Sequence, residues 1–554
     1  MLLAVFSNYL ILLVILGYSF LLKKITYNKD KIIIENIDIL YGLSFIIFIF
    51  LFFNFFFSLV SIKIIVIGIG LFIFLYAISK KVFKLNFFTY FLIIFLTTYI
   101  AFYNGANIDS PMYHLQILNW LSNHKISFGL SNLEIRLGFN STWHSLVALL
   151  DINFFQFSLK YYLSSLILAF IIYESARAKI KIYYSDLFLF LAISYLIFYS
   201  FLHPYLNGVI LNHLGNPERD IIGMLFFFLI IFLFFKVLEN KDNYNYINLL
   251  ILSIFLCVTS RLTMAPMLIL LFFVLYKNRK YKILNLTNIL LFITSTLWIL
   301  RSFFLSGCLF FPFSQSCFKT SWAVNVKEVV FFVEEAMRIS RTLPTRNGVN
   351  DLNFSLNSFD WIPQWINDYY FSAALLQIGS ILMILSFVFF LLVMLIKKNS
   401  YKSFFNIADL CLMFCLILII FLWFISAPET RYALGPIISL PCLFIVILLK
   451  SLNFIKFIKH KDIRPSLIMG ILCILLASKS FDNFQIKDLL LDNKNKHNYS
   501  HIVKIGKFNQ QNFYWGNFLC ADFKNICVNT IKENYKIDRI LNYNVYKSDT
   551  WIKE

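Results

Sequence analysis

The sequence is poor in charged residues. Asp, Glu, Lys and Arg make up 14% of its 554 residues, whereas a typical soluble domain carries about 25%. Apolar runs of about 18 residues, long enough to cross a bilayer as helices, recur along the whole chain. The composition therefore excludes an ordinary soluble protein and predicts an all-α polytopic membrane protein.

Motifs that define several other classes are also absent. No glycine-rich phosphate loop occurs, so ATP-driven transport is not expected. No Cys-x-x-Cys pair or zinc-type His spacing occurs. The net charge of +20 comes from short loops between apolar runs and not from one basic domain, which argues against nucleic-acid binding. The first 22 residues lack a basic leader and a small-residue cleavage site, so we interpret them as a membrane span.

The apolar runs predict about fourteen transmembrane helices. They cover residues 2–22, 38–60, 64–79, 87–103, 158–174, 187–202, 221–237, 246–259, 262–276, 284–300, 371–396, 406–425, 433–449 and 466–478. Only two residues separate the runs 246–259 and 262–276, so an alternative for this pair is one bent hairpin.

Positive charges predict the orientation of these helices. One set of alternate loops is rich in Lys and Arg, at 23–31, 80–84, 177–181, 236–241, 277–282, 397–402 and 450–464, whereas the short loops of the other set hold little beyond Lys63, Arg219, Arg261 and Arg431. Because Lys and Arg in short loops stay in the cytoplasm, we expect both termini and all the long polar loops to face outward.

This topology divides the chain into six segments. They are N-terminal transmembrane helices (1–103), a first large outer loop with an interfacial helix (104–157), central transmembrane helices (158–300), a second large outer loop (301–370), C-terminal transmembrane helices (371–478) and a small polar outer tail (479–554).

Five of the nine cysteines lie within predicted spans, and four lie in outer segments as two close pairs. An oxidising outer compartment favours the disulfides Cys308–Cys317 and Cys520–Cys527. The alternative is two pairs of free thiols.

A polar stretch, NIDSPMYHLQILNWLSNHK, interrupts the apolar sequence in the first outer loop. Met112, Leu115, Leu118 and Leu121 recur at helical spacing, which predicts an interfacial helix on the outer leaflet. Asp109 precedes this helix. Its carboxylate is expected either to cap the helix or to act as a general base.

Glu218 and Asp220 stand where the span 221–237 begins. Asp220 could simply cap that helix. The two carboxylates, with Asp109, are alternatively suited to bind a divalent cation such as Mg²⁺ or Mn²⁺, or to orient a substrate hydroxyl.

Three arginines lie at the predicted outer surface, where orientation does not require positive charge. They are Arg261, Arg301 and Arg431. A single arginine could extend to lipid headgroups, but a planar guanidinium is also suited to bidentate phosphate binding. The set predicts an anionic ligand such as a lipid phosphate or diphosphate.

Several of these motifs occur together in one known superfamily. The first loop has Asp109, then Tyr113, His114 and Leu115, then Gly129, Asn132, Leu133 and RLGFNS at 136–141. Later come Arg301, Ser306-Gly307, Phe311-Pro312 and Trp322, and finally Ala427, Pro428, Arg431 and Tyr432. In this order the motifs resemble the GT-C superfamily of integral-membrane glycosyltransferases, and most closely an uncharacterised bacterial branch of it.

The resemblance implies a function, a location and roles for the residues. It implies a transferase in a bacterial inner membrane, with its active site and both termini on the periplasmic side. A sugar would pass from a polyprenyl-phosphate donor to a glycan, lipid or protein acceptor. Asp109 would act as base, while Tyr113 and His114 would shape its pocket. The arginines would neutralise the leaving phosphate, and Glu218 and Asp220 would bind the acceptor or a metal.

This chain departs from the family pattern in two respects. Three extra spans precede the first outer loop. Asp109 also lacks the acidic neighbour that some members have, which leaves the metal dependence of the site open. Two other classes of membrane protein would also need arginines at the outer surface and a groove for a lipid. One is a flippase or transporter of lipid-linked glycans, although the chain has no internal repeat and few mid-span ionisable groups. The other is an O-antigen polymerase or ligase, which would use a diphosphate donor. A membrane protein without chemistry is a third alternative.

Overall fold

The computed structural model describes most of the chain. The described residues are 1–27, 32–103, 109–151, 153–154, 157–180, 183–202, 213–240, 243–342, 358–370, 377–381, 384, 388, 406–451, 465–478, 503–508, 511–515, 527–528, 535–540 and 543–548.

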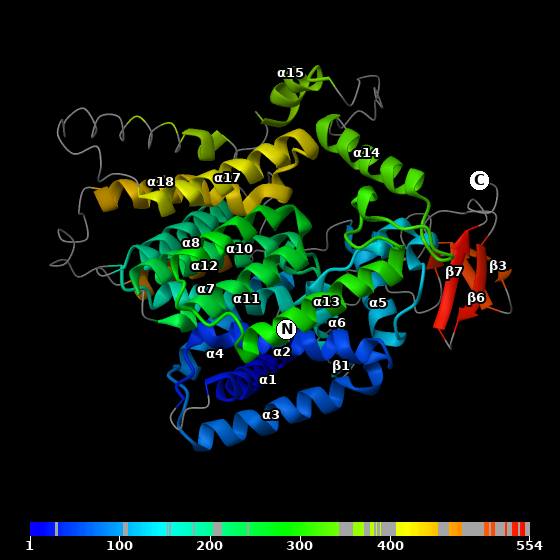
Figure 1. Ribbon diagram of the computed structural model, residues 1–554. Coiled ribbons are helices and arrows are strands. Elements are labelled where there is room, and N and C mark those ends of the chain that lie inside the picture. The colour runs from blue at the N-terminus through cyan, green and yellow to red at the C-terminus, as the bar shows by residue number, and fades with distance from the viewer. Residues whose placement is uncertain are drawn as a thin grey trace.

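The described chain is mainly a bundle of α-helices (Figure 1). In chain order these are α1 (Leu2–Tyr27), α2 (Ile39–Asn54), α3 (Lys63–Ser79), α4 (Phe87–Tyr103), α5 (Leu115–Asn123), α6 (Thr142–Leu150), α7 (Leu163–Ala176), α8 (Tyr184–Leu202), α10 (Asp220–Glu239), α11 (Tyr244–Ser260), α12 (Leu268–Lys277), α13 (Leu286–Ser306), α14 (Val326–Thr342), α15 (Trp361–Trp365), α17 (Ile407–Ser426), α18 (Leu434–Ser451) and α20 (Pro465–Ser478).

Six helical segments among the described residues are long and apolar enough to cross a membrane. They are Leu2–Tyr27, Asn36–Asn54, Asp220–Glu239, Leu286–Ser306, Ile407–Ser426 and Thr430–Lys450. The predicted class, a helical membrane protein, is therefore confirmed. The other described apolar helices have 10–17 residues. At 1.5 Å per residue they are shorter than the roughly 30 Å hydrocarbon core of a bilayer, so the count of fourteen spans stays a prediction. Most of the predicted span 371–396 lies outside the described residues.

The two runs at 246–276 form separate helices. α11 ends at Ser260, Arg261 is extended with φ −150° and ψ 109°, and the 3-10 turns of η7 (Leu262–Met267) lead into α12. Since α11 and α12 pack against each other, the sequence folds here as a hairpin and places Arg261 at its tip.

Close packing of small residues joins the first helices. A Cβ atom on Gly17 of α1 would lie 2.1 Å from the carbonyl oxygen of Gly70 in α3. Only glycine permits this approach, which is typical of helix pairs in membranes. α10 occupies the centre of the bundle, where α7, α8, α11 and α18 surround it and every residue from Ile221 to Val237 is buried. The central position of α10 fixes the place of Asp220, its first residue.

Basic residues gather at one end of the bundle. Lys23 pairs with Asp38 at 2.6 Å, and Lys236 pairs with Asp186 at 2.6 Å. α10 carries Asp220 at its other terminus, sixteen residues and therefore about 24 Å from Lys236. We call the end of the bundle that carries Lys23 and Lys236 the basic end. The orientation of the bundle in a membrane stays a prediction.

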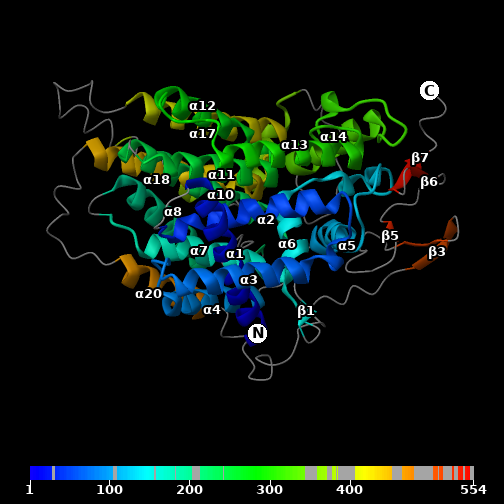
Figure 2. The same ribbon diagram turned by 60° about the horizontal axis from the view of Figure 1, so that its bottom comes forward.

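Segments from the predicted outer loops meet at this opposite end. α5, α6, α14 and the C-terminal strands lie together on the right of Figures 1 and 2. The strands are β3 (Val503–Phe508), β4 (Gln511–Trp515), β5 (Cys527–Val528), β6 (Tyr535–Ile540) and β7 (Tyr543–Ser548). β3 and β4 are antiparallel, β5 joins β4 in parallel, and β6 and β7 form an antiparallel hairpin.

The tail contacts the first outer loop directly. The amide of Phe128 donates to the carbonyl oxygen of Asn544 in β7 at 2.9 Å. The strands were not predicted from the sequence. They place the tail at the same end of the bundle as the first loop, and a second two-stranded pair, β1 (Asn153–Phe154) with β2 (Phe157–Ser158), lies in that loop.

Cys308 and Cys317 form a disulfide in the second large loop, the pairing expected from the sequence. Of the second predicted pair, Cys520 lies outside the described residues, and Cys527 lies in β5.

Candidate functional site

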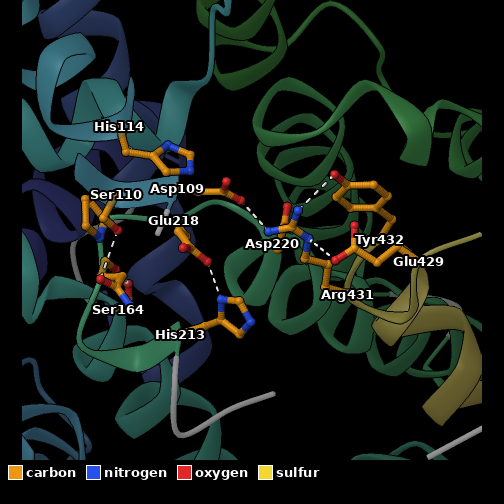
Figure 3. Close-up of polar contacts among 12 residues, drawn as sticks. Asp109, Ser110, His114, Ser164, His213, Glu218, Asp220, Glu429, Arg431 and Tyr432 are labelled. Carbon is orange, nitrogen blue, oxygen red and sulfur yellow. Dashed lines mark hydrogen bonds and ion pairs between the residues drawn. The ribbon is translucent and has the colours of Figure 1, made fainter. Parts of the chain in front are cut away.

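Four charged residues from distant segments converge at the end of the bundle opposite the basic end. Figure 3 shows three of them, Asp109, Asp220 and Arg431. Asp109 precedes a single π-helical turn, Ser110–His114, that leads into α5. Asp220 begins α10, Arg261 follows α11, and Arg431 lies in the 3-10 turn Thr430–Ala433 before α18. We call these four residues, with Glu429 and Tyr432, the charged cluster.

Arg431 is the centre of the charged cluster. Its Nη1 atom forms an ion pair with Asp109 Oδ2, and its Nε atom lies 2.7 Å from Glu429 Oε1. Its Nη2 atom lies 3.2 Å from the hydroxyl of Tyr432. One guanidinium therefore holds two carboxylates at once.

Asp109 does not cap the helix that follows it. Its backbone is helical, with φ −64° and ψ −27°, and its side chain makes no capping hydrogen bond. The capping alternative for Asp109 is therefore wrong in this structure. The predicted helical run is present, because the π-helical turn Ser110–His114 continues directly into α5. α5 packs against α6 and η2 (Leu59–Ser61).

A second ion pair joins Asp220 to Arg261, with an Nη1–Oδ1 distance of 2.6 Å. The same Nη1 atom donates to the carbonyl oxygen of Arg431 at 3.4 Å, and the guanidinium lies 4.6 Å from the centre of the Tyr432 ring. Arg261 thus connects its own ion pair to that of Arg431. Both side chains of the Asp220–Arg261 pair are about nine-tenths buried.

Glu218 lies beside the cluster and pairs with His213. Burial disfavours the charged imidazole, but the adjacent carboxylate outweighs burial and raises the pKa of His213. Sequence reasoning missed both His213 and Glu429. The signal was present, because each lies within five residues of a predicted site residue in a polar outer segment.

Hydrogen bonds fix the backbone around Asp109. Ser110 Oγ donates to Asn216 Oδ1 at 2.9 Å, and Ser164 Oγ donates to the carbonyl oxygen of Asn216 at 3.0 Å. Trp143 Nε1 donates to the carbonyl oxygen of Pro217 at 3.1 Å. These bonds join the residue after Asp109 to α7 and to the segment that carries Glu218 and Asp220.

Tyr113 and His114 lie next to the charged cluster. Burial raises the pKa of Tyr113, and the Asp109 carboxylate raises it further. His114 Nδ1 and His144 Nε2 are 2.8 Å apart. Burial, followed by His144 and nearby arginines, lowers the pKa of His114 well below 6.5. His114 is therefore a neutral imidazole beside the charged residues.

Arg301 is separate from the charged cluster. It lies in α13 and donates from Nη1 to Asn140 Oδ1 at 2.6 Å. Of the three arginines that the sequence groups together, the structure brings together Arg261 and Arg431.

The acidic residues do not form a metal-binding set. No three His, Cys, Asp or Glu side chains within the described ranges are arranged to hold a metal ion. Asp109 faces Arg431, Asp220 faces Arg261 and Glu218 faces His213. A divalent cation does not fit this arrangement, because each carboxylate is directed toward a different cationic group.

Membrane-length helices with a buried charged cluster at one end define the class of this protein as a helical membrane protein with a polar site. A family model described as a domain of unknown function (DUF8201) matches residues 1–438, and the chain belongs to this family. The matched region contains every residue of the charged cluster and ends before the C-terminal tail. No curated protein and no solved structure matches the chain.

Proposed function

We propose that the protein is a GT-C-type glycosyltransferase that uses a polyprenyl-phosphate-linked sugar at the outer face of a bacterial inner membrane. The observation that supports this most is the convergence of Asp109, Asp220, Arg261 and Arg431. A carboxylate beside two guanidiniums provides a base and a phosphate-binding group within one buried site.

In the proposed reaction the oxygen of an acceptor hydroxyl attacks the anomeric carbon of the donor sugar. The bond from that carbon to the phosphate oxygen breaks, the hydroxyl proton passes to Asp109, and polyprenyl phosphate leaves. Arg431 and Arg261 stabilise the negative charge that develops on the phosphate. Tyr113 and His114 shape the pocket, and Asp220 and Glu218 orient the acceptor.

The ligand-free arrangement gives the donor phosphate a further role. In the ligand-free arrangement the Asp109 carboxylate is engaged by Arg431 through Oδ2. A phosphate that binds Arg431 competes with the carboxylate and releases it. Donor binding would then activate the base, so that Asp109 becomes free only when a sugar is present.

An apolar cavity supports a lipid-linked donor. It has a volume of about 320 Å³ and lies between α8, α18 and α20. The lining side chains are Leu191, Ser194, Tyr195, Phe198, Pro441, Cys442, Ile445 and Leu472. Cys442 is eleven residues from Arg431, so about 16 Å of helix separates the cavity from the charged cluster. A lipid chain in this cavity could leave its phosphate at Arg431.

The test is the glycolipid profile of cells that make the wild-type protein or Asp109→Asn at equal membrane levels. We expect the product to be lost with Asp109→Asn. Asp151→Asn is the matched control, because Asp151 lies in the same loop and its Oδ1 atom accepts hydrogen bonds from nearby Ser158 and Lys160. An unchanged profile with Asp109→Asn would refute the catalytic role. Sugar transfer from a diphosphate-linked donor would instead indicate a polymerase or ligase. Loss of glycan export without loss of sugar transfer would indicate a flippase.

A further inference from the structure

Arg301 is a buried charge outside the charged cluster. It is 5% exposed, and its guanidinium lies 5.8 Å from the centre of the Phe50 ring. Its hydrogen bond to Asn140 is to a neutral amide. No carboxylate of the described residues pairs with it, whereas Arg261 and Arg431 each pair with one.

A buried charge without a counterion is strongly unfavourable. The Nε atom of Arg301 is also buried and has no hydrogen-bond partner. An unused N–H group in a dry environment adds a further cost. Both costs disappear if an anion binds to the guanidinium edge that carries Nε, since a planar guanidinium can donate two parallel hydrogen bonds to an oxyanion.

His144 supplies a second unused group near Arg301. It is fully buried, and its Nδ1 atom has no hydrogen-bond partner. Burial, with help from Arg219 and Arg301, lowers the pKa of His144 to about 3. The ring is therefore neutral at physiological pH and carries one N–H hydrogen. When His144 Nε2 accepts from His114 Nδ1, 2.8 Å away, this hydrogen is on His144 Nδ1 and can be donated to a ligand.

The segment that joins these two groups is held rigidly. Asn140 Nδ2 donates to the carbonyl oxygen of Trp298 at 2.6 Å, and Trp298 Nε1 donates to the carbonyl oxygen of Asn140 at 2.7 Å. Asn140 thus ties the segment before α6 to α13, and His144 follows four residues later. These bonds, with the one from Arg301 Nη1 to Asn140 Oδ1, hold the guanidinium in position.

We propose that Arg301 and His144 form a second anion-binding site that takes a phosphate group, with Asn140 holding the guanidinium in position. This site lies beside the charged cluster and is linked to it through the contact between His144 and His114. A tetrahedral phosphate can accept hydrogen bonds from the guanidinium and the imidazole in different directions. The source is either free phosphate or the phosphate of a lipid. The site does not depend on the proposed transferase reaction, because it is defined by binding and needs no turnover.

The test is thermal unfolding of the purified full chain in detergent during titration with two probes. One is inorganic phosphate and the other is dihexanoyl phosphatidic acid, with dihexanoyl glycerol as the phosphate-free control. We expect a phosphate probe to raise the Tm of the wild type. With Arg301→Gln or Arg301→Lys the same shift should require at least ten times more probe. Stabilisation by phosphatidic acid alone would assign the site to a lipid, and stabilisation by both probes to free phosphate.

Two further variants make the result specific. Arg136→Gln removes an arginine at the same end of the bundle that already pairs with Glu134 at 3.7 Å, and it should respond as the wild type does. Arg431→Met removes the donor site proposed above and should keep the response. If neither probe stabilises the wild type, or if the response survives Arg301→Lys and is lost with Arg431→Met, the second site does not exist. If Arg301→Gln fails to fold, Arg301→Lys still tests the site, because lysine keeps the positive charge and lacks the planar guanidinium.

Discussion

The two partners of the Asp109–Arg431 ion pair should differ in their effect on stability. The side chains are 18% and 20% exposed, so the pair is largely buried and solvent screens it only partly. Removing one partner of a buried pair typically costs about 3–5 kcal/mol, since the other charge stays buried. The two substitutions, however, leave different charged groups without a partner.

Asp109→Asn leaves Arg431 with Glu429 at 2.7 Å and with the Tyr432 hydroxyl. Arg431→Met leaves two carboxylates, those of Asp109 and Glu429, without their cation. We therefore expect Arg431→Met to destabilise the protein by about 3–5 kcal/mol. For Asp109→Asn we expect about 1.5–3 kcal/mol, the value for one hydrogen bond to a charged group.

The assay is thermal unfolding of the two single variants and the double variant in detergent. The double variant should be more stable than the sum of the single effects predicts, by about 1–3 kcal/mol, because the partners are in contact. Lys84→Met calibrates the measurement. Lys84 pairs with Glu35 across an exposed 3.4 Å contact, so its loss should be barely measurable. A larger loss for Asp109→Asn than for Arg431→Met would refute the assignment of Arg431 as the shared cation.

Three other predictions concern different parts of the molecule. The adjacent Glu218 raises the pKa of His213 in the folded protein. The stability that this ion pair contributes is therefore complete below the unfolded pKa of about 6.5 and is lost as the pH rises through the higher folded pKa. The Tm difference between the wild type and His213→Asn should shrink over that pH range. Replacing Cys308 and Cys317 by Ser should cost about 2–3 kcal/mol, as expected for a short closed loop, measured by thermal unfolding. A cysteine at Lys280, in a loop rich in Lys and Arg, should react with a membrane-impermeant maleimide only after the cells are opened.

Each of these three has a direct control. A Tm difference that stays constant with pH would mean that the histidine does not titrate against the carboxylate. Dithiothreitol should lower the Tm of the wild type by more than it lowers the Tm of the serine variant. Labelling of intact cells at the Lys280 position, above the level of the unsubstituted chain, would invert the predicted topology.

Periodicity and hydropathy predict the helices well because they are local properties. A membrane helix is specified by its own apolar side chains, and the runs at 2–22 and 221–237 correspond to α1 and α10. The length of each helix is less predictable. Where it ends depends on the residues that pack against its termini, as the extended backbone at Arg261 illustrates.

The partners of the site residues are less local. Asp109 and Arg431 are 322 positions apart, and no pattern around either residue identifies the other. The grouping of Arg431 with Arg261 depends on how α10, α11 and α18 pack together. Arg301 has the same local signal as the other two, yet α13 packs against α2 and places it elsewhere.

The tail strands were missed for a similar reason. A short polar segment carries little hydrophobic pattern, and β7 is stabilised partly by its contact with the first outer loop at Phe128. The sequence places this segment outside the bundle by its polarity. It does not specify which surface the segment would pair with.

The pairing of charges limits how a ligand can bind. Asp109, Glu429 and Asp220 already neutralise Arg431 and Arg261, so an anion reaches these arginines only by exchange with a carboxylate. Exchange gains little free energy, because one ion pair replaces another, but it leaves a carboxylate free to accept a proton. Arg301 has no such partner among the described residues, so binding there relieves a buried charge and should be tight. The two kinds of arginine therefore suit different tasks: exchange at Arg431 suits a catalytic step that must turn over, and Arg301 suits retention of a phosphate group.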